Sequence, residues 1–283
     1  MADNPVRWFE WSEEAFLKAE AEDKPIVLDL MATWSYGCRV MDETVYRDPE
    51  VAELLARDYI AVRVDSDRRP DLNDRYNLGG WPTTGFLTPS GLLMGGTTIV
   101  TRDQMKLLLV QLKSGYLLNK SRLAEEIARR DAKVAEVMES PLTGVANLTI
   151  EIFRKTVRGI VATHDSLHGG FGEAPKQPMP ASLRVVLQAW FETQGPDFAT
   201  VLVKTLDAMS ERGMYDAVNG GFFHYATNNL WSVARTEKLC EDNAQLARLY
   251  LDAAGILGQP KYRTKALHAL GWVRERLLDP ERG

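Results

Sequence analysis

The sequence of 283 residues predicts an α/β domain followed by an all-α domain. Short apolar runs rich in β-favouring residues are confined to about the first 118 residues. Amphipathic stretches and two glycine-aromatic loops fill the chain beyond residue 145. Between them, residues 119–139 are charged and helix-favouring and lead into Ser140-Pro-Leu-Thr-Gly144. We therefore predict domains at residues 1–118 and 145–283, joined by a connecting helix and linker at 119–144.

The first domain is expected to open with a buried strand from Ile26 to Met31, because a short apolar run follows turn-forming residues at 23–25. A helical region then fits from about Cys38 to Ala56. Asp48-Pro-Glu50 interrupts it, since aspartate is a good N-cap and proline suits the first position of a new helix. We therefore predict that the first strand is followed by two consecutive helices.

Two further strand signals and a helix complete the first domain. Residues 59–64 predict a second strand, and residues 83–87 and 92–100 predict a hairpin around Pro89-Ser-Gly91. Residues 102–118 have apolar side chains at helical spacing. Strand–helix–strand followed by hairpin and helix indicates a mixed sheet with helices on both faces.

The second domain is predicted to be helical throughout. Helices fit residues 146–163, 181–193, 197–212, 237–256 and 261–278. Between them lie loops with Gly-Gly-Phe triplets that start at residues 169 and 220, which are 51 residues apart. Two helices and their loops fill such a period, which favours stacked helical hairpins.

The segment from Leu28 to Cys38 resembles the strand and redox turn of the thioredoxin family, in which a tryptophan precedes Cys-x-x-Cys at a helix start. The resemblance implies that Trp34 is that tryptophan and Asp29 the buried acid of the strand. Cys38 matches the second, resolving cysteine, and Ser35 stands where the attacking cysteine should be.

The serine changes the chemistry expected of the turn. Thiol–disulfide exchange needs a thiolate that attacks and a second thiol that releases the product, and a hydroxyl supplies neither. Cys38 alone would still form a mixed disulfide with a protein thiol or become a sulfenic acid. Alternatively, Cys38 is a small buried apolar residue. Asp29 would accept a proton from Cys38 only in the reactive case, and is otherwise a buried acid satisfied by its neighbours.

Gly80-Trp-Pro-Thr83 resembles the thioredoxin loop whose proline is cis and faces the redox turn. We therefore expect a cis peptide bond before Pro82. This expectation holds whether the loop binds a substrate or only fixes the sheet.

A more specific resemblance spans nearly the whole chain. Its motifs are Cys38 to Leu55, Val64 to Asp71, Gly79 to Gly91, Gly169 to Lys176, Gly213 to Asp216, Gly220 to Tyr225 and Glu237 to Ala244. In this order they resemble the spermatogenesis-associated/YyaL-type thioredoxin-domain family. The resemblance implies a thioredoxin-like domain followed by an (α/α)6 toroid similar to N-acylglucosamine 2-epimerases and six-hairpin glycosidases.

The chain departs from this family in three places. The family typically has Cys-His-x-Cys-His at the redox turn, where this chain has Ser35-Tyr-Gly-Cys-Arg39. The family's Pro-His-Phe before Glu-Lys is Ala234-Arg-Thr236 here. Family members also continue beyond Gly283, so we expect a truncated toroid. Its exposed apolar helix faces favour self-association, unless the chain is a fragment.

Six residues near the glycine loops are candidates for binding a carbohydrate: Asp216, His224, Tyr225, Trp231, Glu237 and Asp242. In toroid enzymes such loops line a sugar-binding mouth, where aromatic rings stack on sugars and acids or histidines move protons. The alternative is that these residues cap helices and close hydrogen bonds within the loops.

No metal or cofactor is expected. His164 and His168 have metal-ligand spacing around Asp165, but no further ligand is evident. The two cysteines exclude a disulfide scaffold, and Cys240 is expected to pack in the core.

Charge and hydropathy limit the classes of partner and the cellular locations that we expect for this protein. The chain has 39 acidic and 34 basic residues without a basic run, which disfavours nucleic acid. No apolar stretch is long enough to span a membrane, and no secretory signal is present, so we expect a cytoplasmic protein.

The leading hypothesis is a monothiol or redox-inactive thioredoxin-like module that binds a protein or its thiol. The alternatives are a sugar-processing enzyme and an interaction scaffold.

Overall fold

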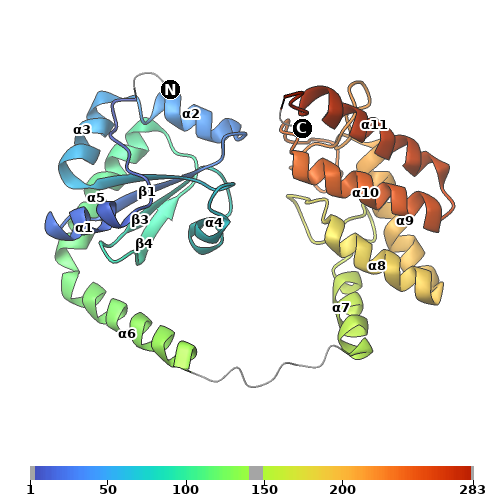
Figure 1. The fold of residues 1–283 in the computed structure, drawn as a ribbon, viewed down its shortest axis with the longest axis horizontal. Helices are drawn as coiled ribbons and strands as arrows, with labels where there is room; N and C mark the ends of the chain where they lie inside the picture. Colours follow the sequence, from blue (N-terminus) through green and yellow to red (C-terminus); the bar gives the residue numbers. More distant parts are fainter. Residues whose placement is uncertain (1–3, 140–148, 282–283) are drawn as a thin grey trace. The chain divides into compact units, whose positions relative to one another are not determined.

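The computed structural model describes residues 4–139 and 149–281, and the chain divides into two compact units, residues 1–145 and 146–283. Figure 1 shows strands only in the first of them. The predicted boundary at residues 140–144 falls outside the described residues.

One mixed sheet forms the centre of the first unit. Its strands are β1 (Ile26–Met31), β2 (Ile60–Asp65), β3 (Thr83–Leu87) and β4 (Leu93–Thr97), in the order β2-β1-β3-β4. β1 runs parallel to β2 and antiparallel to β3, and β3 runs antiparallel to β4. This confirms the mixed sheet and the hairpin expected from the sequence.

Helices cover both faces of that sheet (Figure 1). The covering helices are α1 (Glu13–Ala21), α2 (Tyr36–Thr44), α3 (Pro49–Asp58), α4 (Pro70–Tyr76) and α5 (Arg102–Leu118). α6 (Lys120–Glu139) follows α5 and extends away from the sheet (Figure 1). α1 and α4 pack with Ile26, Leu28 and Leu30 on one face. α2, α3 and α5 pack on the other, around Val27 and Phe86. The helices α1 and α4 were not predicted.

The break between α2 and α3 has the predicted cause. The Asp48 carboxylate accepts hydrogen bonds from the backbone N–H groups of Glu50 and Val51, each at 3.1 Å, and Pro49 is the first helical residue. A capped start and a proline together fix where α3 begins. The turn that carries Cys38 therefore belongs to the separate, shorter helix α2.

The second unit consists of helices joined alternately by long loops and short turns. They are α7 (Ile150–Ala162), α8 (Pro180–Thr193), α9 (Pro196–Glu211), α10 (Cys240–Ile256) and α11 (Pro260–Arg276). Their shared core includes Leu187, Leu202, Leu206, Leu246 and Tyr250. The helices expected from the sequence are present, although α7 begins at Ile150 instead of residue 146 and α10 begins three residues later than predicted. Among the described residues, no helix is long and apolar enough to cross a membrane.

Candidate functional site

Ser35 caps the helix that carries Cys38. Its Oγ accepts a hydrogen bond from the backbone N–H of Cys38 at 3.3 Å, as an N-cap residue should. The same hydroxyl donates to the carbonyl of Trp81 at 3.2 Å. Ser35 thus joins the start of α2 to the loop before β3, and only 4% of it is exposed.

Cys38 lies beneath this cap. It is 4% exposed, and its Sγ accepts a hydrogen bond from the backbone N–H of Ala32 at 3.4 Å. Burial raises the pKa of the Cys38 thiol, and the hydrogen bonds from Ala32 and Ser35 offset this only in part. The thiol form is therefore favoured at neutral pH.

The loop that faces the turn is close to it. The peptide bond between Trp81 and Pro82 is cis, as predicted, and Pro82 is buried. A Cβ atom added at Gly37 would lie 2.9 Å from the Trp81 carbonyl oxygen and 2.7 Å from a methyl group of Ile99. Only glycine fits at position 37, because the turn, the proline loop and Ile99 leave no room for a side chain.

Aromatic and apolar side chains surround the turn. The Trp34 and Trp81 rings pack edge to face at 5.2 Å, and the Trp34 indole N–H donates to Asp67 at 3.1 Å. Tyr36 is 58% exposed, and Ile99 is 52% exposed. A partly apolar surface therefore lies at the turn that carries the buried thiol.

Asp29 is placed where the resemblance expects it, but it has a partner that the sequence did not indicate. It is 2% exposed, and its carboxylate accepts a hydrogen bond from the Arg63 Nε at 2.7 Å. The Tyr46 hydroxyl lies 3.4 Å from the other carboxylate oxygen. Burial raises the pKa of Asp29 to about 6, against the opposing effect of Arg63.

Arg63 was missed because its ion pair depends on strand pairing. Asp29 and Arg63 are 34 residues apart in sequence but directly opposite in the β1–β2 register. A signal was nevertheless present, because an arginine in an otherwise apolar predicted strand needs an anionic partner.

The two glycine loops of the second unit share one architecture. The backbone N–H groups of Leu167 and His168 donate to the Asp165 carboxylate, and Lys176 Nζ lies 2.8 Å from it. Lys176 also donates to the Gly169 carbonyl. The first loop is thus closed around one aspartate and one lysine.

The second loop repeats this arrangement 51 residues later. Backbone N–H groups of Val218 and Asn219 donate to Asp216, and Lys238 Nζ lies 2.7 Å from both Asp216 and the Gly220 carbonyl. Asp216 therefore closes its own loop, which is the alternative the sequence left open for it. The repeat includes the lysine contact, although Lys176 lies 11 residues after its aspartate and Lys238 lies 22 residues after its own.

Trp231 does not line an open mouth. It is fully buried, its indole N–H donates to the Gly169 carbonyl at 3.1 Å, and its ring lies against Gly170. A ring enclosed on both faces cannot stack on a sugar, so this placement argues against the carbohydrate contact expected of Trp231.

The remaining four loop candidates lie in one cluster. His224 Nδ1 is 2.6 Å from the Asp242 carboxylate, and the His224 backbone N–H donates to the Glu237 carbonyl at 2.8 Å. The rings of His224 and Tyr225 pack edge to face at 5.3 Å. An imidazole held by a carboxylate is an arrangement suited to proton transfer.

The structure also places two further residues singled out in the sequence, Cys240 and His168. Cys240 is exposed at the start of α10, so the prediction that it packs in the core was wrong. The His168 imidazole and the Lys176 ammonium both contact the Asp165 carboxylate. The lysine places a positive charge where a metal would have to bind.

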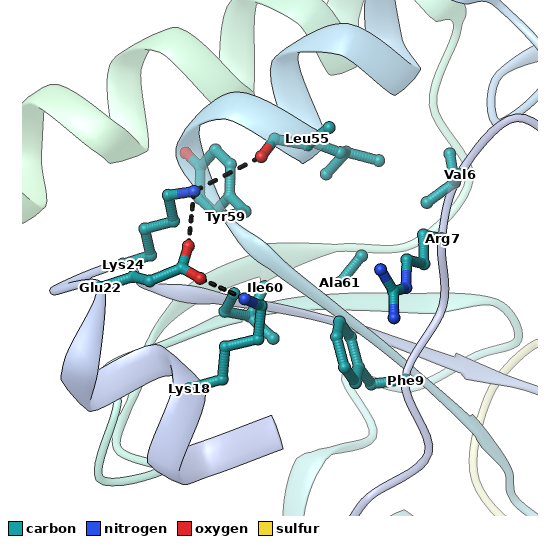
Figure 2. Close-up of a pocket in the computed structure, with 11 residues that line it drawn as sticks. Val6, Arg7, Phe9, Lys18, Glu22, Lys24, Leu55, Tyr59, Ile60 and Ala61 are labelled. Carbon is teal, nitrogen blue, oxygen red and sulfur yellow. Dashed lines mark hydrogen bonds and ion pairs between the residues drawn. The ribbon is translucent and has the colours of Figure 1, made fainter. Parts of the chain in front are cut away.

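A hollow of about 250 Å³ lies at the amino end of β2 (Figure 2). Its floor is formed by residues that are at most 6% exposed, namely Val6, Leu55, Tyr59, Ile60 and Ala61. At its rim, Lys18 and Lys24 are both paired with Glu22. Because β1 and β2 are parallel and the Cys38 turn follows β1, the hollow lies at the opposite end of the strands from that turn.

Comparison with known proteins agrees with this organisation. Residues 1–139 match the DsbH-like thioredoxin family, which is described as a family of unknown function, DUF255. Over 98% of its length, the chain is 32% identical to spermatogenesis-associated protein 20 of Homo sapiens and of Mus musculus. The chain belongs to the spermatogenesis-associated protein 20 family. It spans 38% of the length of these relatives.

Solved structures are similar to each half of this family member. A thioredoxin from Thermus thermophilus is 25% identical, with a TM-score of 0.35, over 38% of this chain and 87% of that one. A cellobiose 2-epimerase from Spirochaeta thermophila is 18% identical, with a TM-score of 0.41, over 50% of this chain and 40% of that one. The family model, the mixed sheet of the first unit and the helices of the second agree with the predicted fold class, a thioredoxin-like α/β domain followed by an all-α domain.

Proposed function

We propose that the thioredoxin-like domain is a protein-binding module that does not catalyse dithiol–disulfide exchange. One observation carries the proposal: the Ser35 hydroxyl occupies the helix cap, where it binds the Cys38 N–H and the Trp81 carbonyl. A serine in that position has no sulfur to attack a disulfide. Cys38 supports the same reading, because its thiol is buried and its pKa is raised.

The binding surface of this module is the partly apolar face around the turn. Tyr36 and Ile99 are each more than half exposed, and both lie within or against the turn. The expected partner is a protein segment with apolar side chains. A thiol on that partner is not required, since Cys38 is covered.

Thiol titration tests the redox part of the proposal. With a colorimetric thiol reagent, the exposed Cys240 should react at once, and Cys38 should react only after unfolding. The Cys240→Ser variant isolates Cys38. We expect no reduction of insulin disulfides by the unchanged chain. Robust turnover that disappears in Cys38→Ala would overturn the proposal.

Selection from a displayed peptide library tests the binding part. Peptides that bind the Cys38→Ala variant should lose binding when Tyr36 or Ile99 is changed to Asp. Leu17→Asp is the matched control, because Leu17 is an exposed apolar residue on α1. Peptides that need Cys38, or that tolerate both surface changes, would contradict the assignment of this face.

A second candidate function is favoured by the His224–Asp242 pair. We propose that the helical domain processes a carbohydrate, with His224 moving a proton, Asp242 orienting it and Tyr225 beside it. The test is binding and isomerisation or hydrolysis across a panel of sugars. His224→Ala should abolish any activity, whereas His168→Ala, which removes another aspartate-paired histidine, should not. No binding to any sugar would count against it.

Self-association is a further proposal from the sequence that the helical domain supports. On α11, Leu267 and Leu270 are 50% and 39% exposed on neighbouring turns. Light scattering of the unchanged chain and of a Leu267→Lys/Leu270→Lys variant tests this. A monomer in both cases would exclude association through α11.

A further inference from the structure

Arg63 is held more tightly than an ordinary surface arginine. Its Nε donates to the buried Asp29 at 2.7 Å, and one terminal nitrogen donates to Asp42 at 2.6 Å. Its guanidinium lies 4.3 Å from the centre of the Trp8 ring and 5.5 Å from that of Tyr46. Two carboxylates and two aromatic rings therefore fix this side chain, which is 19% exposed.

Asp29 and Asp42 are the two carboxylates whose charges act on the Cys38 thiol, and Asp29 is the buried one of the two. Cys38 is buried as well, and the negative charge of Asp29 contributes to the raised pKa of its thiol. The titratable groups that face Asp29 are Arg63 from β2, Asp42 and Cys38 from α2, and Tyr46 from the segment after α2. Across β3, Thr84 is the polar neighbour in register.

We propose that Arg63 is a positioning residue that commits Asp29 to an ion pair and withholds it from proton exchange with Cys38. The turn would then lack a proton acceptor as well as an attacking thiol. This inference rests on the proposed function of the thioredoxin-like domain. It goes beyond that function because it assigns a second, independent cause of inactivity to a residue outside the turn.

The physical reason is the cost of breaking a buried ion pair. If Asp29 took a proton from Cys38, the Arg63 guanidinium would lose a buried anionic partner, which is unfavourable in a low-dielectric interior. At neutral pH, Asp29 therefore stays ionised beside Arg63. Without the guanidinium, burial alone would raise the pKa of Asp29 further, towards the range of the thiol with which it would exchange a proton.

The test supplies the missing thiol and then removes Arg63. In Ser35→Cys, the introduced thiolate attacks a disulfide substrate and one substrate sulfur leaves as a thiolate. Cys38 must then lose its proton to a base and attack the mixed disulfide. The second substrate thiolate leaves, and a 35–38 disulfide forms. Dithiothreitol in the assay reduces that disulfide, so electrons pass from dithiothreitol to the substrate.

The readout is the rate of disulfide reduction between pH 5 and pH 9. We expect Ser35→Cys to show one inflection, set by the introduced thiol. Adding Arg63→Met should raise the rate at pH 7 at least about tenfold and add a second inflection, as general-base assistance does. Asp29→Asn in the same background should remove both gains. Arg63→Lys should resemble the parent, and Arg47→Met, which removes an exposed arginine, is the control.

Superimposed profiles for Ser35→Cys with and without Arg63→Met would overturn the inference. If Arg63→Met fails to fold, carbon NMR of the Asp29 carboxyl in the unchanged chain decides the matter. An Asp29 that is fully ionised from pH 7 to pH 9 supports the inference, and one that titrates with Cys38 in that range overturns it. Disulfide turnover by the unchanged chain would instead sink the proposed function, so the two failures are distinguishable.

Discussion

Aspartate–cation pairs occur in both domains, and their surroundings give them opposite electrostatic properties. Burial raises the pKa of Asp29 to about 6, although Arg63 lies 2.7 Å away. In the helical domain, the pKa of Asp165 and that of Asp216 are lowered. There the opposing effect of burial is outweighed by hydrogen bonds from lysine and from two backbone N–H groups per carboxylate.

The difference lies in how each carboxylate is solvated by the protein. Asp29 sits on a strand whose backbone N–H groups are used in the sheet, so only side chains reach its oxygens. Asp165 and Asp216 begin loops that fold back and direct N–H groups at them. At the 2% exposure of the Asp29 side chain, an ion pair does not offset burial, whereas at the 17% and 16% exposure of Asp165 and Asp216 an ion pair combined with backbone donors does.

The largest expected effect is loss of the buried lysine in the first glycine loop. Lys176→Met removes a fully buried ammonium and leaves Asp165 with its backbone donors and the His168 imidazole. We expect the helical domain to lose about 3 kcal/mol of stability. Lys238→Met, whose side chain is 9% exposed, should cost about 2 kcal/mol. Hydrogen exchange of peptides from residues 149–281 in urea measures both.

The exposed Lys155 on α7 provides the control for these two variants. Lys155→Met should change the stability of the helical domain by less than about 0.5 kcal/mol. If the two loop variants were equally mild, the lysines would not close the loops, and the comparison between the domains would fail.

The pH dependence of stability should differ in sign between the domains. Between about pH 4 and pH 6 the folded chain holds a proton on Asp29 that the unfolded chain has released, so the contribution of Asp29 to the unfolding free energy of the first domain falls as pH rises. The fall is at most about 3 kcal/mol. Asp165 and Asp216 stabilise the helical domain above pH 4, and this contribution is lost on acidification.

Urea unfolding of the full chain at several pH values, resolved by domain through hydrogen exchange, measures these slopes. Asp29→Asn should abolish the fall in the first domain and leave the helical domain unchanged. Slopes of the same sign in both domains would show that backbone donors do not separate the two kinds of pair.

The smallest effect is expected for Asp42, the more exposed of the two carboxylates that are paired with Arg63. The Asp42 side chain is 34% exposed, and pairs that reach solvent contribute little, so Asp42→Asn should cost about 0.5 kcal/mol. Because the charge of Asp42 helps to raise the pKa of Asp29, that pKa should fall in the variant. Carbon NMR of Asp29 measures the change, and a rise would contradict the network described here.

The sequence was informative wherever the signal was local. Short apolar runs bounded by turn residues located the strands, and Asp48-Pro49 located the break between α2 and α3. The triplets at 169 and 220 revealed a repeat that the structure extends to entire loops. α1 was missed although Ser12 supplies its N-cap, because its apolar face is made of alanines.

The burial of individual side chains depends on tertiary contacts, and local sequence reasoning predicted it wrongly at two positions. Cys240 was expected in the core because free cysteines are usually buried, yet it begins a helix at the surface. Trp231 follows a loop and was expected to be accessible, yet it fills the space beside Gly170. Residue type and neighbouring sequence do not reveal which face of a loop is covered.

The sequence by itself determined that this chain has a thioredoxin-like domain and a helical domain, and that position 35 lacks sulfur, because these follow from periodicity, motif order and one atom type. Only the tertiary structure decided that Arg63 is paired with Asp29 and that two lysines close the glycine loops. Those pairings join residues 11 to 34 positions apart, and their strength depends on burial and on backbone donors that only the folded chain brings together.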